Sequence, residues 1–288
     1  MDRSDLAERM KGYEKRNRYY LQRRMPVILR LDMRAGHSFT RGFERPFDEV
    51  FIKSMQDTAK YLCKNIQNCK LSYQQSDEIT LLLVDYDKLN TDCFFDYRVD
   101  KLCSIAASMA KMAFNKYFYD NVFVYNATAT VDLSDKKYPF KEVYSKAVDK
   151  GAMFDARCFN IPKEEVTNNF YWRQLDASRN SIQMVGQANF SHKELHKKSR
   201  NDIQDMLMTQ KGINWNNLPT YQKRGSCCIK IEENITENNS VEKMEFGEDR
   251  KKTVVNIEHS HWIIDKEIPI FKGEGREYID RLVFVGEE

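Results

Sequence analysis

Residues 71–84 contain two apolar, β-prone runs that enclose the polar sequence Gln75-Ser76-Asp77-Glu78. Apolar runs of this kind are typical of strands, and a short polar sequence between two of them marks a turn. The pattern therefore predicts a β-hairpin with two carboxylates, those of Asp77 and Glu78, at its tip. The rest of the chain has to supply the elements that bury its apolar runs.

A second acidic position follows another short β-prone run, residues 27–31, which ends at Asp32. If this strand lies beside the hairpin, Asp32 and Asp77 meet at one end of a sheet. Converging carboxylates repel each other unless a cation joins them, and Mg²⁺ takes one or two carboxylates together with substrate phosphates. The spacing alone also allows another interpretation, in which Asp32 caps a strand and Asp77 and Glu78 form a solvated turn.

The bulk composition excludes some classes of protein. At 288 residues, with 41% hydrophobic and 31% charged residues, the chain suits one large soluble domain or a domain with an extension. The net charge of +3 is too small to predict nucleic-acid binding, so any basic surface must be local. We expect no membrane span, because the sequence has no long apolar run. We expect a cytoplasmic protein, because no leader is recognised and the seven cysteines, which have no C-x-x-C spacing, resemble reduced thiols.

The pattern up to residue 160 predicts the order strand, helix, strand, strand, helix, strand. Strands are expected at 26–32 and 152–160, in addition to the hairpin at about 69–84. Apolar residues at three- and four-residue steps predict helices at 47–66 and 97–118. Pro46 is expected in the first turn of the earlier helix, with Asp48 near its positive end. A further charged helix is expected within residues 1–24.

This order is the ferredoxin-like split βαβ arrangement, an α+β fold in which an antiparallel βαββαβ sheet carries its helices on one face. The palm domains of many nucleotidyl polymerases and of nucleotide cyclases share it. In such palms one carboxylate ends the first strand and another lies in the central hairpin, which is where Asp32 and Asp77 fall. The agreement favours the metal-site interpretation without choosing among enzymes.

Beyond residue 160 the chain is expected to be helical and polar, and then β-rich. Helices are expected at 163–187 and 192–210, an exposed loop at 232–252, and strands at 253–257, 261–264 and 278–285. We therefore expect a palm catalytic domain with an N-terminal helix at 1–160, a helical and basic region at 161–230, and a C-terminal extension of unknown role at 231–288. The basic cluster at 192–200 either contacts phosphates or forms a solvated helix face.

Several short sequences, in this order along the chain, match the motifs of one family. They are Arg30-Leu31-Asp32 with Arg34 and His37, Phe43-Glu44-Arg45-Pro46-Phe47-Asp48, Tyr73-Gln74-Gln75-Ser76-Asp77-Glu78, Lys101, Phe154-Asp155-Ala156-Arg157, Tyr171-Trp172-Arg173-Gln174 with Asp176, and Lys223-Arg224-Gly225. Through them, over about residues 25–230, the chain resembles the tRNA-His guanylyltransferase superfamily, and within it the guanylyltransferase-like 3′-to-5′ polymerases.

The resemblance implies an enzyme that adds nucleotides to the 5′ end of tRNA, opposite to the usual direction of polymerases. In the family a 5′-monophosphate is activated with ATP, and the 3′-hydroxyl of GTP or another NTP then attacks the activated phosphate. Both attacks are in-line displacements at phosphorus, which two Mg²⁺ ions suit. The resemblance also implies a homotetramer.

The same resemblance implies roles for individual residues. Asp32 and Asp77 would hold both Mg²⁺ ions with the carbonyl of Met33, and Glu78 would be a supporting catalytic acid. The implied nucleotide-binding residues are Arg34, Ala35, Gly36, His37, Arg45, Asp48, Ser76 and Lys101, with Asp48 meeting the purine base. The implied contacts with RNA or nucleotide are Trp172, Arg173, Gln174, Asp176, Lys223 and Arg224, to which the basic cluster adds Lys198 and Arg200.

Departures from the family's pattern separate two activities within it. Met33 stands where glycine is usual, Gly36 where an aromatic residue is usual, and Arg45 where lysine is usual. The eukaryotic guanylyltransferases carry His-Ile-Asn-Asn-Leu-Tyr-Asn after Trp-Arg-Gln, and residues 178–184 differ from that run. Templated repair of 5′-truncated tRNA therefore fits better than dedicated addition of G to tRNA-His, which stays an alternative.

Two other classes of protein stay open. A nucleotide cyclase, or another palm enzyme for small nucleotides, would need no polynucleotide surface and would leave the basic elements at 192–230 unused. A non-catalytic RNA-binding palm would have no reason to retain the acids Asp32, Asp77 and Glu78.

Overall fold

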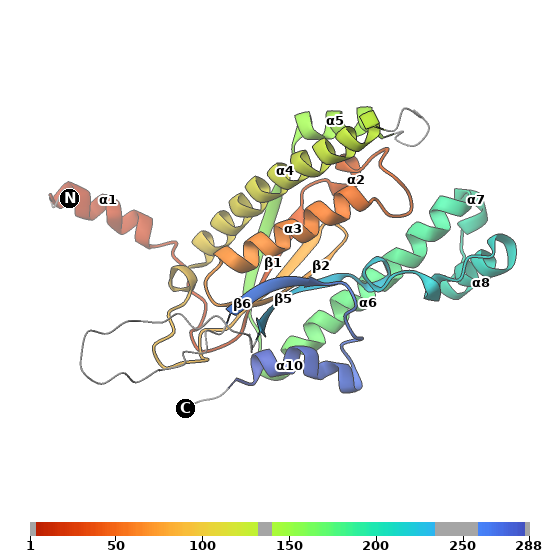
Figure 1. Ribbon diagram of the computed structural model, residues 1–288. Coiled ribbons are helices and arrows are strands. Elements are labelled where there is room, and N and C mark those ends of the chain that lie inside the picture. Colours follow the sequence, from red (N-terminus) through yellow and green to blue (C-terminus); the bar gives the residue numbers. More distant parts are fainter. Residues whose placement is uncertain (1–3, 132–139, 234–258, 286–288) are drawn as a thin grey trace, which may run out of the picture.

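One antiparallel sheet forms the centre of the protein. In this computed structural model, which describes residues 4–131, 140–233 and 259–285, the strand order is β4-β1-β3-β2-β5-β6 (Figure 1). The strands are β1 (Val27–Met33), β2 (Cys69–Gln75), β3 (Glu78–Leu83), β4 (Phe154–Asn160), β5 (Ser226–Glu233) and β6 (His259–Asp265). Strands β2 and β3 pair directly, so the predicted hairpin is confirmed.

The helices connect and cover these strands. They are α1 (Asp5–Lys15), α2 (Gly36–Phe39), α3 (Glu49–Asn65), α4 (Val99–Val131), α5 (Lys141–Lys150), α6 (Lys163–Asn189), α7 (His192–Leu195), α8 (Arg200–Lys211), α9 (Thr220–Arg224) and α10 (Glu277–Val283). The succession β1, α3, β2, β3, α4, β4 with the sheet order β4-β1-β3-β2 is the ferredoxin-like arrangement. The α+β palm predicted from the sequence is therefore confirmed.

Alternation along β1 divides its side chains between the two faces of the sheet. Leu29 and Leu31 belong to a core shared with α3 and α4, whereas Ile28 belongs to a second core with Phe170 of α6 and the buried Phe271. Helices α3 and α4 thus cover one face, as expected for a palm, and α6 with α10 covers the other (Figure 1). Because both faces are covered, every residue of β3 is buried.

A cluster of aromatic rings fixes α2 and the loop after it. The ring centroid of Phe39 lies 5.6 Å from that of Phe114 and 5.4 Å from that of Phe118, and Phe43 stacks on Phe118 at 5.8 Å. Such pairs contribute ~0.5–1.5 kcal/mol each beyond the burial of their surface. The cluster holds the chain between β1 and α3 close to the hairpin tip.

Two helices differ in length from the sequence predictions. Helix α3 begins at Glu49 rather than around Pro46, because Asp48 is its N-cap and accepts a hydrogen bond from the Phe51 amide at 2.8 Å. Helix α4 continues to Val131, well past the predicted end at residue 118.

The region after residue 190 departs furthest from the predictions. The helix expected at 192–210 is divided into α7 and α8, because Ser199 starts a new helix through a capping box with Asp202. The strand expected at 278–285 is wrong: Ile279 and Val283, four residues apart, form the buried side of helix α10. The strand at 261–264 is confirmed within β6, whereas the strand at 253–257 and most of the loop at 232–252 lie outside the described residues.

Residues 268–283, here called the C-terminal segment, pack onto the palm. Strand β5 runs through residue 231, where the extension was expected to begin, and β6 pairs with it in the main sheet. The fully buried ring of Phe271 lies 6.0 Å from the ring of Tyr73 on β2. The amide of Gln174 donates to the Pro269 carbonyl at 2.8 Å and accepts from the Phe271 amide at 3.0 Å, so it fastens this segment to α6.

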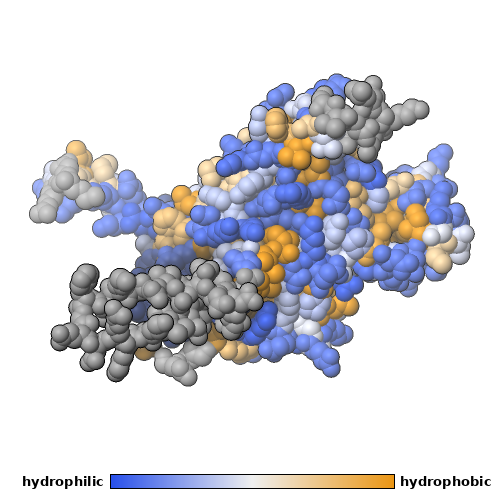
Figure 2. Space-filling view, viewed as in Figure 1, coloured by the Kyte–Doolittle hydropathy of each residue, from blue (hydrophilic) through white to orange (hydrophobic). Residues whose placement is uncertain are grey.

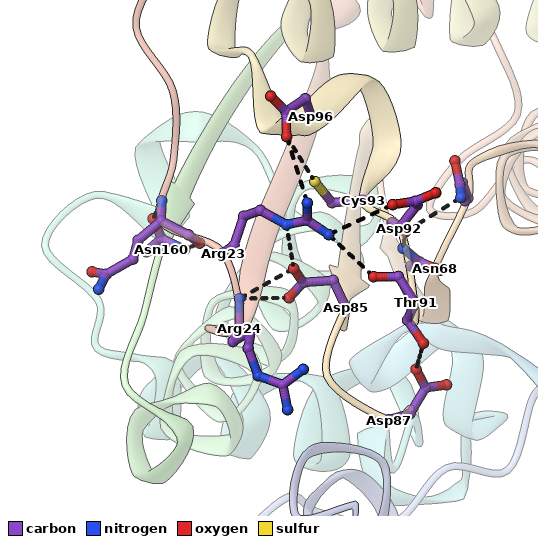
Figure 3. Close-up of polar contacts among 12 residues, drawn as sticks. Arg23, Arg24, Asn68, Asp85, Asp87, Thr91, Asp92, Cys93, Asp96 and Asn160 are labelled. Atoms are coloured by element: carbon purple, nitrogen blue, oxygen red, sulfur yellow. Dashed lines mark hydrogen bonds and ion pairs between the residues drawn. The ribbon is translucent and has the colours of Figure 1, made fainter. Parts of the chain in front are cut away.

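A polar cluster fastens the chain before β1 at the end of the sheet remote from Asp32 (Figure 3). The Arg24 amide donates to both carboxylate oxygens of the buried Asp85, at 2.9 and 3.1 Å. The Nε atom of Arg23 lies 3.6 Å from the same carboxylate. Since Asp85 follows β3, the cluster joins the beginning of β1 to the end of its neighbour.

The outer surface is mostly polar. Figure 2 shows hydrophilic residues over most of the face seen in Figure 1, with smaller apolar areas between them. Helix α1 lies apart from the sheet, and none of its residues is buried (Figure 1). Among the described helices, none combines the length and the apolar character needed to cross a membrane.

We expect Phe271→Ala to lower the free energy of unfolding by about 3–5 kcal/mol, because it removes a fully buried ring from the second core. Ile270→Ala is the matched control, because Ile270 is next to Phe271 but is 52% exposed. Its truncation should cost less than about 0.5 kcal/mol. Chemical denaturation of the two variants measures the difference. Equal stability would contradict the placement of the C-terminal segment in the core.

Candidate functional site

Strand register brings acidic side chains to one end of the sheet. Asp32 lies opposite Glu78 in the β1–β3 pair and opposite Asp155 in the β1–β4 pair. The turn residue Asp77 adjoins them, because the Met33 amide donates to the Asp77 carbonyl at 3.0 Å. Asp32 and Asp77 therefore lie together, as expected from the hairpin and the first strand.

The surroundings of Asp32 oppose its negative charge. Burial and the nearby carboxylates of Asp77, Glu78 and Asp155 raise the pKa of Asp32 from its ordinary value of 3.8 to about 6. Burial also raises the pKa of Asp77. A divalent cation at this place would favour the charged form of both carboxylates.

Glu78 differs from the other acids because its charge is already balanced. The Nε and one terminal nitrogen of Arg173 donate to its two carboxylate oxygens at 2.8 and 2.6 Å, and both side chains are buried. The same guanidinium donates to Asp176 at 3.1 Å. A bidentate pair of this kind fixes the position of both groups. Glu78, which the resemblance implies as a supporting acid, is therefore held beside Asp32 by Arg173.

The remaining donors suit a Mg²⁺ ion that a nucleotide completes. In the part of the chain that the structure describes, no three His, Cys, Asp or Glu side chains form a metal-binding group. The Asp32–Asp77 pair is nevertheless acidic, partly buried and adjacent. Because Mg²⁺ takes one or two carboxylates and fills its other positions with water and substrate phosphates, the pair fits it.

A pocket of about 300 Å³ opens beside Asp77. Its walls come from α2 and the loop that leads to α3, from the hairpin tip, from α6 and from α9. This volume is at the lower end of the range for small-molecule sites, roughly 300–1,000 Å³. It is called the hairpin pocket below.

Glycine is required where α2 passes Asp77. A Cβ atom at Gly36 would lie 1.9 Å from Oδ2 of Asp77, so a larger residue would displace this carboxylate. The positive φ angle of this turn, 55°, falls on Ala35, while Met33 stays in β1. The absence of the family's glycine at position 33 is therefore accommodated without strain at Met33.

Most of the predicted nucleotide-binding residues lie at the hairpin pocket. Gly36, His37, Arg45, Asp48 and Ser76 line it, and Arg34 and Ala35 are exposed in the turn just before α2.

Lys101 is not brought to this pocket. It lies in the first turn of α4, where the Val99 amide bonds to the Tyr19 carbonyl at 2.9 Å, near the beginning of β1. The part of α4 that packs near α2 is around Phe114, roughly 20 Å further along the helix axis at about 1.5 Å per residue. Within one chain, a phosphate in the hairpin pocket is therefore beyond the reach of Lys101.

Asp48 lines the hairpin pocket, but its carboxylate is already in use. It accepts hydrogen bonds from the amides of Phe51 at 2.8 Å and Glu44 at 3.0 Å, and from the hydroxyl of Tyr144 at 2.7 Å. Burial raises the pKa of Asp48 in spite of these bonds. The structure therefore gives this side chain a structural role, and a purine base would have to compete with three internal donors.

Three of the four predicted contact residues on α6 are engaged within the protein. Arg173 and Asp176 belong to the ion pairs with Glu78, and Gln174 holds the C-terminal segment. Trp172 differs from them, because it is 51% exposed.

Of the basic residues expected to contact RNA, some are exposed and one is buried within the protein. Lys198 and Arg200 are exposed beyond the end of α6. Lys223 is buried, and its ammonium group donates to the Asn216 carbonyl at 2.6 Å. Lys223 therefore supports the fold of α9 and is not placed for RNA, whereas Arg224 next to it is partly exposed.

Sequence reasoning missed one wall of the hairpin pocket. Ala177, Asn180, Ser181, Met184 and Gln187 line it from α6. Their spacing of three or four residues places them on one side of the helix, a signal that was present in the sequence. The set overlaps residues 178–184, the run in which this chain departs from the eukaryotic guanylyltransferases.

We expect Asp32→Asn to stabilise the metal-free protein near neutral pH by on the order of 1 kcal/mol, after allowance for solvent screening. Because the pKa of Asp32 is raised on folding, the folded protein favours the protonated carboxyl group. The contribution of Asp32 to the stability of the fold is therefore complete below pH 3.8 and is lost as the pH rises through about 6. Asparagine resembles the protonated form at every pH. Thermal unfolding between about pH 4 and pH 8 measures the effect.

The same variant tests the metal site. Mg²⁺ with ATP should raise the melting temperature of the wild type and leave that of Asp32→Asn almost unchanged, since bound ligand stabilises only a competent site. A variant less stable than the wild type near neutral pH would contradict the electrostatic assignment.

We expect Gly36→Ala to weaken Mg²⁺-dependent ATP binding by roughly tenfold to a hundredfold, because the new methyl group displaces the Asp77 carboxylate. Gly12→Ala is the control, since no atom lies within 4 Å of a Cβ at that position. Calorimetric titration with ATP and Mg²⁺ compares the variants. Unchanged affinity in Gly36→Ala would show that Asp77 does not contact the bound nucleotide.

Comparison with known proteins gives matches over the whole described fold. The family model described as tRNAHis guanylyltransferase (Thg1) matches residues 7–162. Two solved structures of a bacterial tRNA(His) guanylyltransferase (Thg1)-like protein each cover 98% of this chain and 100% of the bacterial chain. The structure in complex with ATP is 39% identical to this chain, with a TM-score of 0.74. The structure in complex with GTP is 36% identical, with a TM-score of 0.73. The tRNA(His) guanylyltransferase of Saccharomyces cerevisiae is 28% identical over 214 residues, 69% of this chain and 80% of the yeast protein.

Proposed function

The chain belongs to the tRNA(His) guanylyltransferase family, whose model matches more than half of it, and on this premise we propose that it repairs the 5′ end of tRNA by templated nucleotide addition. Members of the family are nucleotidyltransferases, so the protein is an enzyme of this class. The finer proposal is 3′-to-5′ polymerisation directed by the opposing strand of the acceptor stem. Dedicated addition of G to tRNA-His is the alternative.

The position of Asp77 is the observation that carries this proposal. Its side chain lines the hairpin pocket, and its backbone adjoins the strand that ends at Asp32. A nucleotide bound in the pocket would therefore present its triphosphate to both carboxylates. The related bacterial protein was solved in complex with ATP and with GTP, which supports the proposal that this chain binds both nucleotides.

Asp32 and Asp77, with the carbonyl of Met33, would hold two Mg²⁺ ions, which supply activation of the attacking oxygen and stabilisation of the leaving group. The hydrogen bonds between Glu78 and Arg173 hold α6 in a fixed position relative to the hairpin tip. His37, Arg45 and Ser76 lie along the same pocket and would bind and orient the phosphates.

Two displacements at phosphorus account for the reaction. An oxygen of the tRNA 5′-phosphate attacks the α-phosphorus of ATP and releases pyrophosphate, which leaves an adenylylated 5′ end. The 3′-hydroxyl of the incoming NTP then attacks the 5′-phosphorus of the tRNA and releases AMP. A tRNA with a 5′-triphosphate needs only the second displacement, with pyrophosphate as the leaving group.

The chemistry of the hairpin pocket supports selection of the base by the template. Gln75, Asn180 and Gln187 line the pocket with amide groups, which both donate and accept hydrogen bonds and so tolerate different bases. The carboxylate of Asp48, which would favour the donor edge of guanine, is held by Tyr144 and two backbone amides. Base identity would then come from pairing with the opposite strand.

Surfaces outside the pocket fit the partners that the family implies. The exposed Lys198 and Arg200 are available to tRNA phosphates. Exposed apolar side chains on α4, including Met112 and Phe123, are available for contacts between copies in the homotetramer that we propose. We place this activity in the cytoplasm, where its tRNA substrates are found.

The decisive experiment offers a tRNA that lacks its first 5′ nucleotide and carries a labelled 5′-phosphate, with ATP, the four NTPs and Mg²⁺. We expect extension at the 5′ end, with an added base that changes with the opposing nucleotide. Addition of G alone, and only to tRNA-His, would favour the dedicated activity. No extension of any tRNA would favour a cyclase or a non-catalytic RNA-binding palm.

Asp77→Ala should lower the rate of extension by at least about a hundredfold, because the Mg²⁺ site loses one of its two carboxylates. Asp100→Ala is the matched control, since its carboxylate is 54% exposed and pairs with Arg98 at the start of α4. Circular dichroism checks that both variants fold. Full activity of Asp77→Ala would contradict the assignment of the site.

A further inference from the structure

Trp172 is exposed beside Arg173, Gln174 and Asp176 of α6, which are engaged within the protein. Its ring lies against the guanidinium of Arg173, whose Cζ is 4.7 Å from the ring centroid. That guanidinium is in turn held by Glu78 and Asp176. The indole is therefore both 51% exposed and supported by a cation that cannot move freely.

The direction of Trp172 follows from the geometry of α6. Thr167 and Gln174 point toward the C-terminal segment, where they bond to Asp280 and to the backbone at 269–271. Trp172 lies two residues before Gln174 and so projects about 200° around the helix axis from it. It therefore points away from the C-terminal segment, and Arg173, against which its ring lies, reaches Glu78 opposite Asp32 of β1.

The two strands that carry Asp32 and Asp155 also carry a pair of like charges. Arg30 of β1 lies directly opposite Arg157 of β4, two pairs along from Asp32 and Asp155 and so on the same face of the sheet. Arg157 is 52% exposed and 3.3 Å from Asp155, and the buried Nε of Arg30 has no hydrogen-bond partner among the described residues. Like charges placed directly opposite destabilise a sheet, so an anion that bridges them would relieve the repulsion.

Trp172 lies outside the hairpin pocket. Asp77 and the α6 residues 177–187 line the pocket, whereas Trp172 lies further back on α6 and takes no part in its walls. A nucleotide bound in the pocket would therefore leave the exposed Trp172 ring accessible to a second nucleotide.

We propose that Trp172 is a stacking platform for the nucleobase at the 5′ end of the RNA, with Arg30 and Arg157 facing its phosphate. This inference rests on the proposed function. An indole stacks on every base, and its contribution is therefore independent of sequence, as the repair of different tRNAs requires. Arg173 links the platform to Glu78 and so holds the base in a fixed relation to the carboxylates.

The first test follows the fluorescence of the protein on titration with a 5′-truncated tRNA and, separately, with ATP and Mg²⁺. We expect the tRNA to quench part of the emission in the wild type and the quenching to be reduced in Trp172→Phe, which retains only Trp215 and Trp262. Equal quenching by tRNA in both proteins would overturn the proposal. Loss of the ATP-induced change in the variant, with the tRNA-induced change intact, would assign the ring to the free nucleotide and also overturn it.

The second test compares extension kinetics. Trp172→Ala should raise KM for the tRNA roughly tenfold to a hundredfold, with a smaller change in KM for ATP, and Trp172→Phe should recover most of this loss. Leu175→Ala is the matched control, because this side chain is 46% exposed on the same helix and should leave both constants unchanged. An unchanged KM for tRNA in Trp172→Ala would overturn the proposal, as would equal losses in Trp172→Ala and Leu175→Ala.

The two tests separate this inference from the proposed function. Wild-type extension of tRNA with no effect of Trp172→Ala refutes the platform and leaves the function standing. Tryptophan quenching by tRNA that depends on Trp172, in a protein that extends no tRNA, refutes the function and leaves the platform standing.

Discussion

The buried ion pair between Glu78 and Arg173 joins the two halves of the site. Glu78 belongs to the hairpin tip, opposite Asp32, and Arg173 belongs to α6. Because removal of one partner would leave an uncompensated buried charge, at a cost of about 3–5 kcal/mol, the pair holds α6 across the acidic end of the sheet. The pocket wall formed by α6 and the exposed ring of Trp172 are positioned by the same contact.

The palm and its carboxylates could be predicted because local pattern and topology agree. The apolar runs around Asp77 form a hairpin, and a one-residue slip of β1 would turn Leu29 and Leu31 out of their core. Register is therefore fixed by burial, and it places Asp32 opposite Glu78. The family motifs add an independent constraint at the same positions, and the match to the family model confirms that resemblance.

The sequence was less informative about what each motif residue touches. Gln174 and Lys223 belong to the motif set, yet their polar groups bond to carbonyls of this chain. A motif indicates that a residue matters without separating contact with substrate from support of the fold. The motif could not place Lys101 relative to the pocket, because that distance depends on the length and packing of α4. Helix α10 was missed because its partners lie on α6, more than 100 residues earlier.

The attachment of the C-terminal segment to Gln174 has a consequence for the order in which the enzyme matures on the ribosome. These contacts join residues that are 95 and 97 positions apart. The ferredoxin-like part is synthesised first and can begin to fold, but α6 lacks this anchor until residues 269–271 have emerged. A nascent chain thus presents its acidic edge before one face of the second core is closed, and competence for nucleotide transfer is deferred until residues 269–271 have been synthesised.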